Sequence, residues 1–328
     1  MKPNRDDATV HCCADCGEEG GVVNNLKTCK SCMSVKYCNV ACQRNHWATH
    51  KKDCKQRAAE LRDEALFKDP PAKEDCPICF LPMNIQLICC VSLPPATITS
   101  VPINDFAILN VELADEPMEE YYPCCGKSVC KGCMYSFCES ENDDKCPFCN
   151  SDRGSKTDEE RVGEVMKRVE ANDARAIYML ANSYQHGFNG SQQDHAKAME
   201  LYARSAELGH DEAHCQRGKL FYYKGDLKKA KFHYEAAAMA GHEIARCDLG
   251  IMESNSGNTE RAIKHWSIAA SAGEYQAMHT LIKEFEGGFV SRDAIDAILI
   301  AYNNACAEMR SEARDAYLRL NFDLIDEN

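Results

Sequence analysis

The sequence predicts two small cysteine-rich modules in series, followed by an all-α solenoid. Three observations in its 328 residues predict this architecture. First, 19 of the 22 cysteines lie in the first 149 residues. Second, two sets of eight metal-type side chains recur there around C-x2-C pairs, at 13–54 and 76–149. Third, residues 157–320 carry alanine and glycine positions that return every 32 residues, which indicates repeated helical units.

Composition and charge narrow the classes of function. The formal net charge is −13, whereas nucleic acids and membrane surfaces attract positive charge, so we expect neither as a partner of the whole chain. No apolar run reaches the ~18 residues of a membrane-spanning helix. The start, MKPNRDDATV, lacks the apolar core of a signal peptide. We therefore expect a reducing compartment, the cytoplasm or the nucleus.

The cysteines of the first module are spaced as zinc ligands. A secreted disulfide framework is the alternative, but the C-x2-C pairs and the histidine in phase with them favour zinc. Zinc takes four ligands in a tetrahedron, so eight ligands predict two ions, and metal binding supplies folding free energy that so short a segment lacks. The eight candidates are Cys13, Cys16, Cys29, Cys32, Cys38, Cys42, His50 and Cys54.

Residues 11–55 resemble a MYND zinc finger over their full length, including the segment CQRNHWATHKKDC that closes the module. The resemblance implies an interleaved cross-brace, with Cys13, Cys16, Cys38 and Cys42 on one zinc and Cys29, Cys32, His50 and Cys54 on the other. His46 lies four residues before His50 and competes with it, and the family pattern favours His50. The resemblance also implies a protein-interaction module, which in some members binds proline-containing peptides. Some members lie within SET-type methyltransferases, whose companion motifs we do not find.

A linker at 56–75 separates the two modules. Its composition predicts a short helix from Cys54 to Phe67, ended by Asp69-Pro70-Pro71.

The second module, residues 76–150, opens with CPIC, continues with CCGKSVCKGC and closes with CPFC. This pattern resembles an all-cysteine RING finger with a long insertion at 80–123. The resemblance implies one zinc on Cys76, Cys79, Cys130 and Cys133, and another on Cys124, Cys125, Cys146 and Cys149. Cys89, Cys90 and Cys138 stay open as replacements for Cys124 or Cys125, because adjacent ligands need an unusual local geometry.

RING fingers commonly act as ubiquitin ligases, which dock a charged conjugating enzyme and work by positioning it. The resemblance assigns docking to Ile78 and Pro147, inside the first and last C-x2-C pairs. The alternative is that both are structural residues of the metal-binding turns. Active ligases often carry arginine after the last cysteine, where this chain has Asn150.

Residues 157–320 predict a helical solenoid that begins at a Thr157–Glu160 capping box. Glycines return at 209, 241 and 273, candidate N-caps at Asp194, Asp226 and Asn258, and one large aromatic position at Tyr202, Tyr234 and Trp266. The pattern resembles Sel1-like repeats, relatives of the tetratricopeptide class, with three clear units and a longer first one aligned at Ala176. We expect a final helix over about 291–320 to cap the solenoid.

The other histidines and cysteines of the solenoid are expected to be structural. His210 and His242 follow the glycine stops, where a histidine can interact with the carbonyls that end the preceding helix. Cys215, Cys247 and Cys306 are expected to be ordinary buried residues.

The sequence therefore predicts a chain of zinc-stapled MYND-type and RING-like cross-brace modules followed by an all-α Sel1-like solenoid. We expect four structural zinc ions with closed coordination, and no catalytic residue of the chain's own. The favoured function is an intracellular adaptor that recruits proteins or peptides. The alternative is a RING-type ubiquitin ligase partnered by a ubiquitin-conjugating enzyme, and nucleic-acid binding is the weakest hypothesis.

Overall fold

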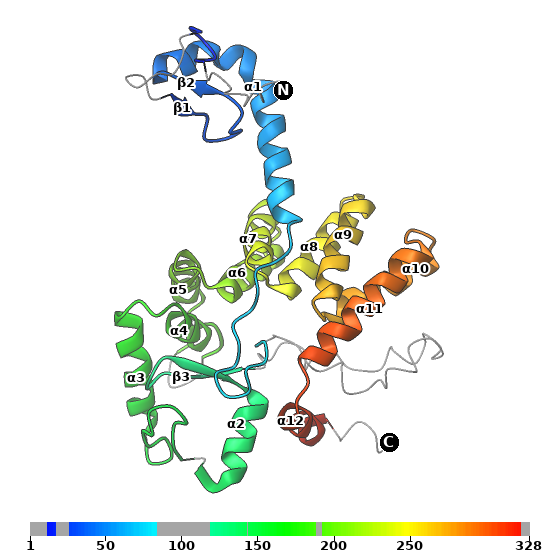
Figure 1. Cartoon of the computed structure of the whole chain (residues 1–328). Helices are drawn as coiled ribbons and strands as arrows, with labels where there is room; N and C mark the ends of the chain where they lie inside the picture. The colour runs from blue at the N-terminus through cyan, green and yellow to red at the C-terminus, as the bar shows by residue number, and fades with distance from the viewer. Residues whose placement is uncertain (1–11, 18–25, 84–118, 143, 188–191, 323–328) are drawn as a thin grey trace, which may run out of the picture. The chain divides into compact units, whose positions relative to one another are not determined.

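The computed structural model describes residues 12–17, 26–83, 119–142, 144–187 and 192–322 (Figure 1). The chain divides into two compact units, Met1–Lys68 and Asp69–Asn328. Cys89, Cys90 and most of the long insertion in the second module lie outside the described residues. No helix of the described residues is long and apolar enough to cross a membrane.

The first unit contains a two-stranded antiparallel sheet and one long helix. Strand β1 (Lys27–Thr28) pairs with β2 (Lys36–Tyr37), and helix α1 covers Val40–Leu66. Asn39 starts α1 because its side chain accepts the backbone N–H of Cys42 at 2.9 Å. The helix expected over 54–67 is thus the second half of a longer helix, which begins inside the metal-binding segment.

In the second unit, the second cysteine-rich module, from here on the second finger, is built on a short hairpin followed by a helix. Strand β3 (Glu119–Tyr122) runs antiparallel to β4 (Lys127–Cys130). Helix α2 (Lys131–Phe137) follows directly and continues into a π-helical turn at Cys138–Asn142. The hairpin and α2 therefore place the middle cysteines of the finger.

The solenoid consists of consecutive helices, and all but the last pack on their neighbours along the chain (Figure 1). They are α3 (Asp158–Glu170), α4 (Ala174–His186), α5 (His195–Glu207), α6 (Asp211–Tyr223), α7 (Leu227–Met239), α8 (Glu243–Asn255), α9 (Thr259–Ser271), α10 (Tyr275–Glu286), α11 (Arg292–Glu308) and α12 (Glu312–Phe322). The predicted capping box opens α3, with both reciprocal hydrogen bonds present.

Small residues let the paired helices approach closely. A Cβ atom added at Gly218 of α6 would lie 2.7 Å from the Tyr234 ring of α7, and Gly250 of α8 meets Trp266 of α9 in the same way. Tyr234 and Trp266 are both 3% exposed. The periodic aromatic position is therefore part of the core, and the glycines opposite it recur at the same period of 32.

His210 and His242 donate their backbone N–H groups to carbonyls at the end of the preceding helix, those of Ser205 and Ala237, but their side chains have a role that was not predicted. Each histidine is the N-cap of the following helix, and accepts the backbone N–H of Ala213 or Ala245 on its ring nitrogen Nδ1. The reason is the preceding glycine, which has a φ of +90° at Gly209 and +100° at Gly241. This left-handed conformation ends one helix and turns the chain, so that the next residue begins another.

The predicted caps Asp194 and Asp226 are confirmed, whereas Asn258 makes no side-chain capping bond. The single helix expected over 291–320 is instead two helices, α11 and α12. The Ser311 hydroxyl accepts the backbone N–H of Arg314 at 3.3 Å and starts α12. Helix α11 packs on α9 and α10, whereas α12 packs on α2 of the second finger.

Candidate metal centres

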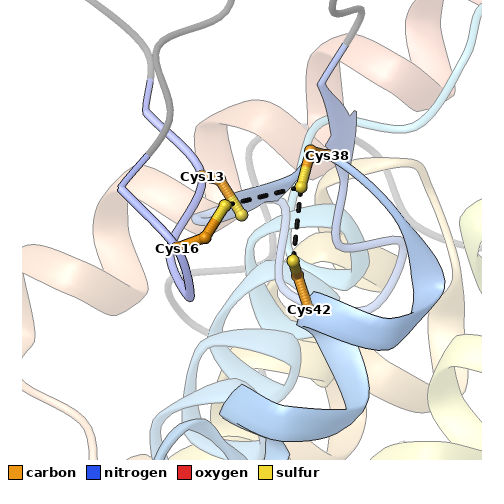
Figure 2. Close-up of side chains that lie close together, drawn as sticks. All are labelled: Cys13, Cys16, Cys38 and Cys42. Carbon is orange, nitrogen blue, oxygen red and sulfur yellow. Dashed lines mark hydrogen bonds between the residues drawn. The ribbon is translucent and has the colours of Figure 1, made fainter.

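Four thiols from three places in the first finger form the first candidate centre. Cys13 and Cys16 come from one turn, Cys38 follows β2, and Cys42 lies in the first turn of α1 (Figure 2). The Sγ atoms of Cys16 and Cys38 are 3.6 Å apart, and those of Cys38 and Cys42 are 3.3 Å apart. All four sulfurs lie within 4.8 Å of one another, so the group can hold a metal ion.

The second centre interleaves with the first. It brings together Cys29, Cys32, His50 and Cys54 within the same 4.8 Å limit. Sulfur atoms of Cys29 and Cys54 are 3.7 Å apart, and the Nε2 atom of His50 lies 3.3 Å from the sulfur of Cys32. His50 and Cys54 are one turn apart on α1, so they share a face of the helix.

His46, the competing histidine, lies outside this centre. Its ring stacks on His50 with centroids 5.5 Å apart, and its Nδ1 atom is 3.0 Å from the Tyr37 hydroxyl. The structure thus places His50 in the donor group and leaves His46 as a neighbour that holds the ring of His50.

Two similar groups lie in the second finger. Cys76, Cys79, Cys130 and Cys133 form one, and Cys124, Cys125, Cys146 and Cys149 form the other. In the former, the sulfurs of Cys79 and Cys130 are 3.8 Å apart. In the latter, the separations are 3.7 Å from Cys125 to Cys146 and 3.5 Å from Cys149 to Cys124. These are the two sets that the RING resemblance implied.

The adjacent thiols of Cys124 and Cys125 reach one centre because the chain turns tightly after β3. The backbone N–H groups of Cys125 and Gly126 both donate to the Tyr122 carbonyl, at 3.2 and 2.8 Å, and Gly126 has a φ of +74°. Cys138 lies at the end of α2, outside this group. The open alternatives Cys89 and Cys90 lie outside the described residues.

Four of the five C-x2-C pairs share a turn that sequence reasoning missed, whereas the fifth, Cys130 and Cys133, starts α2. In each of the four, the residue after the second cysteine donates its N–H to the carbonyl of the first: Gly17 to Cys13, Met33 to Cys29, Phe80 to Cys76 and Asn150 to Cys146, all at 2.8–3.0 Å. The φ angles of these donors are +74°, +55°, +55° and +56°. Asparagine adopts positive φ more readily than most residues, which gives Asn150 a structural reason.

The thiol electrostatics favour a divalent cation. A hydrogen bond from Cys130 lowers the pKa of Cys76 to about 4, and the same interaction raises the pKa of Cys130. Burial raises the pKa of Cys54 to about 12. In each group, one thiolate therefore forms at the expense of its neighbours, and a metal ion is the partner that lets all of them ionise.

The predicted docking residues lie on the metal-binding turns. Ile78 is 41% exposed, Pro147 is half-buried, and Phe80 beside Ile78 is 76% exposed. The first turn of the second finger therefore presents apolar side chains to solvent.

A fifth group, Glu212, Cys215 and His242, lies inside the solenoid, and its nature is different. The Nδ1 atom of His242 accepts the N–H of Ala245, so a neutral ring carries its proton on Nε2. That atom lies 2.7 Å from the Glu212 carboxylate and donates to it. Both ring nitrogens of His242 therefore make hydrogen bonds within the protein. This group is a buried hydrogen-bond network between successive repeats. The 32-residue spacing in the sequence did not predict it.

Comparison with known families agrees with two of the three modules. The MYND finger model matches residues 13–54. The Sel1 repeat model matches three segments, 174–210, 212–242 and 245–274. The chain thus contains a MYND finger and Sel1 repeats, followed by helices beyond the matched units.

Curated relatives share short stretches. Tudor domain-containing protein 1 of Oryzias latipes is 36% identical over 83 residues, 24% of this chain and 6% of that protein. Histone-lysine N-methyltransferase ASHR1 of Arabidopsis thaliana is 36% identical over 47 residues, 14% of this chain and 10% of that protein. The chain therefore spans a tenth or less of the length of these two relatives.

Similar solved structures include Sel1-repeat proteins. A protective antigen of uropathogenic Escherichia coli is 22% identical with a TM-score of 0.38, covering 51% of this chain and 40% of that one. A Sel1 repeat protein from Oxalobacter formigenes is 21% identical with a TM-score of 0.38, covering 49% of this chain and 77% of that one.

Proposed function

We propose that this chain is a zinc-binding adaptor, in which the MYND finger and the Sel1 repeats recruit protein or peptide partners. The observation that carries the proposal is the convergence of sixteen thiol and imidazole donors into four groups of four, two of them in the segment that the MYND model matches. Four protein ligands close a zinc ion to water and substrate, so the metal supplies folding energy and no hydrolytic chemistry. We also propose the cytoplasm or the nucleus as its location.

Zinc content and partner binding test the proposal together. The purified chain is expected to hold four zinc ions by mass spectrometry under native conditions. Proline-containing peptides in an array are expected to bind the wild-type chain and not a Cys29→Ser variant, because this change removes a donor of the first finger.

Cys12→Ser is the matched control for this experiment. Cys12 lies beside Cys13 but is exposed and outside all four groups. Peptide binding that survives Cys29→Ser, or that is lost with Cys12→Ser, would contradict the assignment of binding to a metal-stapled finger.

A second candidate function is RING-type ubiquitin ligation. The exposed Ile78 and Phe80 on the first turn of the second finger favour it, because an apolar surface there suits a docked protein. Its test is the discharge of ubiquitin from a panel of charged conjugating enzymes by the zinc-loaded chain. Acceleration that disappears in Ile78→Ala, with zinc content unchanged, supports a ligase; equal discharge by both proteins removes this role from Ile78.

A further inference from the structure

A cation from the last helix lies against the second finger. Arg314 of α12 is 1% exposed, although arginine is rarely buried. Helix α12 packs on α2, and the two backbones come close where α2 has Gly132. A Cβ atom at that position would lie 2.6 Å from the Arg314 backbone nitrogen. The close approach carries the Arg314 side chain into the finger.

The Arg314 guanidinium ends beside the third metal group. One terminal nitrogen donates to the Leu81 carbonyl at 3.2 Å and lies 3.8 Å from the sulfur of Cys79. The other donates to the Met309 carbonyl at 2.9 Å. Within the part of the chain that the structure describes, none of the hydrogen bonds of this guanidinium goes to a carboxylate.

A buried arginine is costly unless an anion lies nearby. A divalent ion held by the four thiolates of Cys76, Cys79, Cys130 and Cys133 leaves a centre with two net negative charges. Hydrogen bonds from a cation to such sulfurs are charge-assisted and stronger than neutral ones. The metal-loaded third group therefore supplies an anion beside the buried guanidinium.

We propose that Arg314 is the outer-sphere cation of the Cys76, Cys79, Cys130 and Cys133 centre, so that metal binding there and docking of α12 stabilise each other. This inference rests on the proposed function, because it requires zinc in that centre. Arg314 acts through the cysteine ligands and is a positioning residue. Coupling between two binding events is reciprocal, so the factor by which docked α12 raises zinc affinity equals the factor by which zinc raises docking.

Competition with a colorimetric chelator tests this coupling on the full chain. In Arg314→Gln, zinc from one of the four sites is expected to transfer at a chelator concentration about 10- to 100-fold lower, the usual effect of losing an outer-shell partner. Arg314→Lys restores the charge without the planar fork, so its affinity is expected to lie between the two.

Arg310→Gln is the matched control. Arg310 lies four residues earlier, is paired with Asp315 at 3.1 Å, and its contacts with Asp315 involve no metal group. Its competition curve is expected to match wild type. A second variant ends the chain before Glu312 and so lacks α12. Zinc is expected to transfer more easily from the same single site as in Arg314→Gln. This result separates the loss of the helix from a folding defect caused by the Arg314→Gln substitution.

Hydrogen exchange supplies a readout independent of metal affinity. In zinc-loaded Arg314→Gln, amides of α12 are expected to exchange faster than in wild type, with α7 and α8 unchanged. If wild type holds four zinc ions, and Arg314→Gln and the shortened chain both give its competition curve, the inference fails and the adaptor proposal stands. If Cys76→Ser holds as much zinc as wild type, this centre binds no zinc. The inference about Arg314 and the proposal of four bound zinc ions then both fail.

Discussion

At the residue scale, the surroundings of each side chain decide its role among chemically similar candidates. His46 and His50 have the same chemistry and lie one turn apart, yet only His50 points at the thiols of Cys29, Cys32 and Cys54. The Tyr37 hydroxyl engages the other ring. A histidine in phase with a cysteine pattern is thus a ligand only where the helix face meets the metal group.

This difference predicts that two neighbouring histidine substitutions have unequal effects. His50→Ala is expected to lower the zinc content by one ion per chain, because a donor of the second group is lost. His46→Ala is expected to keep all zinc and to lose about 1 kcal/mol of stability, the usual net value of a hydrogen bond. Native mass spectrometry and denaturant unfolding measure the two effects, and equal zinc loss in both variants would contradict the assignment.

A buried carboxyl gives the solenoid a pH dependence. Glu274 occupies the repeat position of His210 and His242, is 4% exposed, and caps α10 by accepting the N–H groups of Gln276 and Ala277. Burial raises its pKa from 4.5 to about 7. Because the folded-state pKa is raised, its stabilising contribution is present below pH 4.5 and is lost as pH rises through 7.

We therefore expect wild type to lose stability relative to Glu274→Gln between pH 5 and pH 8, by a few kcal/mol at about 1.4 kcal/mol per pKa unit. Urea unfolding of both full chains at several pH values measures the difference, and zinc effects common to both proteins cancel. Parallel stability curves would show that the carboxyl titrates at its ordinary pKa.

At the element scale, the repeats are held by glycines that face aromatic rings. Gly218 and Gly250 lie inside α6 and α8, where glycine lowers helix stability. Each leaves room for the ring of the next helix, Tyr234 or Trp266. The backbone cost of these glycines is offset by the close packing of paired helices.

Glycine-to-alanine substitutions in two helices are expected to have opposite signs. Gly218→Ala is expected to destabilise the chain by about 1–3 kcal/mol, because the new methyl group overlaps the Tyr234 ring. Gly163→Ala in α3 meets nothing within 4 Å and is expected to stabilise by about 0.5–1 kcal/mol. Thermal unfolding of both variants measures this contrast, and destabilisation of similar size in the two would contradict the packing explanation.

At the scale of the whole molecule, the second finger and the solenoid belong to one compact unit, whereas the first finger belongs to another. The second finger contacts the solenoid helices on two sides. Arg168 of α3 donates to the carbonyls of Pro123 and Cys124 at 3.0 and 3.3 Å, and Arg314 of α12 reaches the turn at Cys79. The Tyr121 hydroxyl also donates to Asp173 at 2.6 Å.

This division predicts unequal consequences of losing a metal ligand. Cys29→Ser is expected to unfold the first finger alone, with the solenoid signal in circular dichroism retained. Cys130→Ser is expected to loosen α12 and the end of α3 as well, because both contact the second finger. Hydrogen exchange resolved by segment distinguishes them. Faster exchange in α6–α9 after Cys29→Ser would contradict the division into units.

The sequence by itself determined the donors and the repeats, because both are local patterns. Ligand spacing in C-x2-C pairs and the 32-residue return of alanine and glycine are readable along the chain, and so is the capping box at Thr157. The structure added the physical reason for Asn150, a left-handed turn shared by four of the C-x2-C pairs.

Only the tertiary structure decided which groups meet across long separations. The helix expected to cap the solenoid divides at Ser311, and its second part packs on α2, far earlier in the chain. The partners of Arg314, His242 and Glu212 likewise come from other helices or from the finger. Periodicity records which face of a helix is apolar, but not which distant surface covers that face, and this is why burial and charge pairing emerge only when the chain is folded.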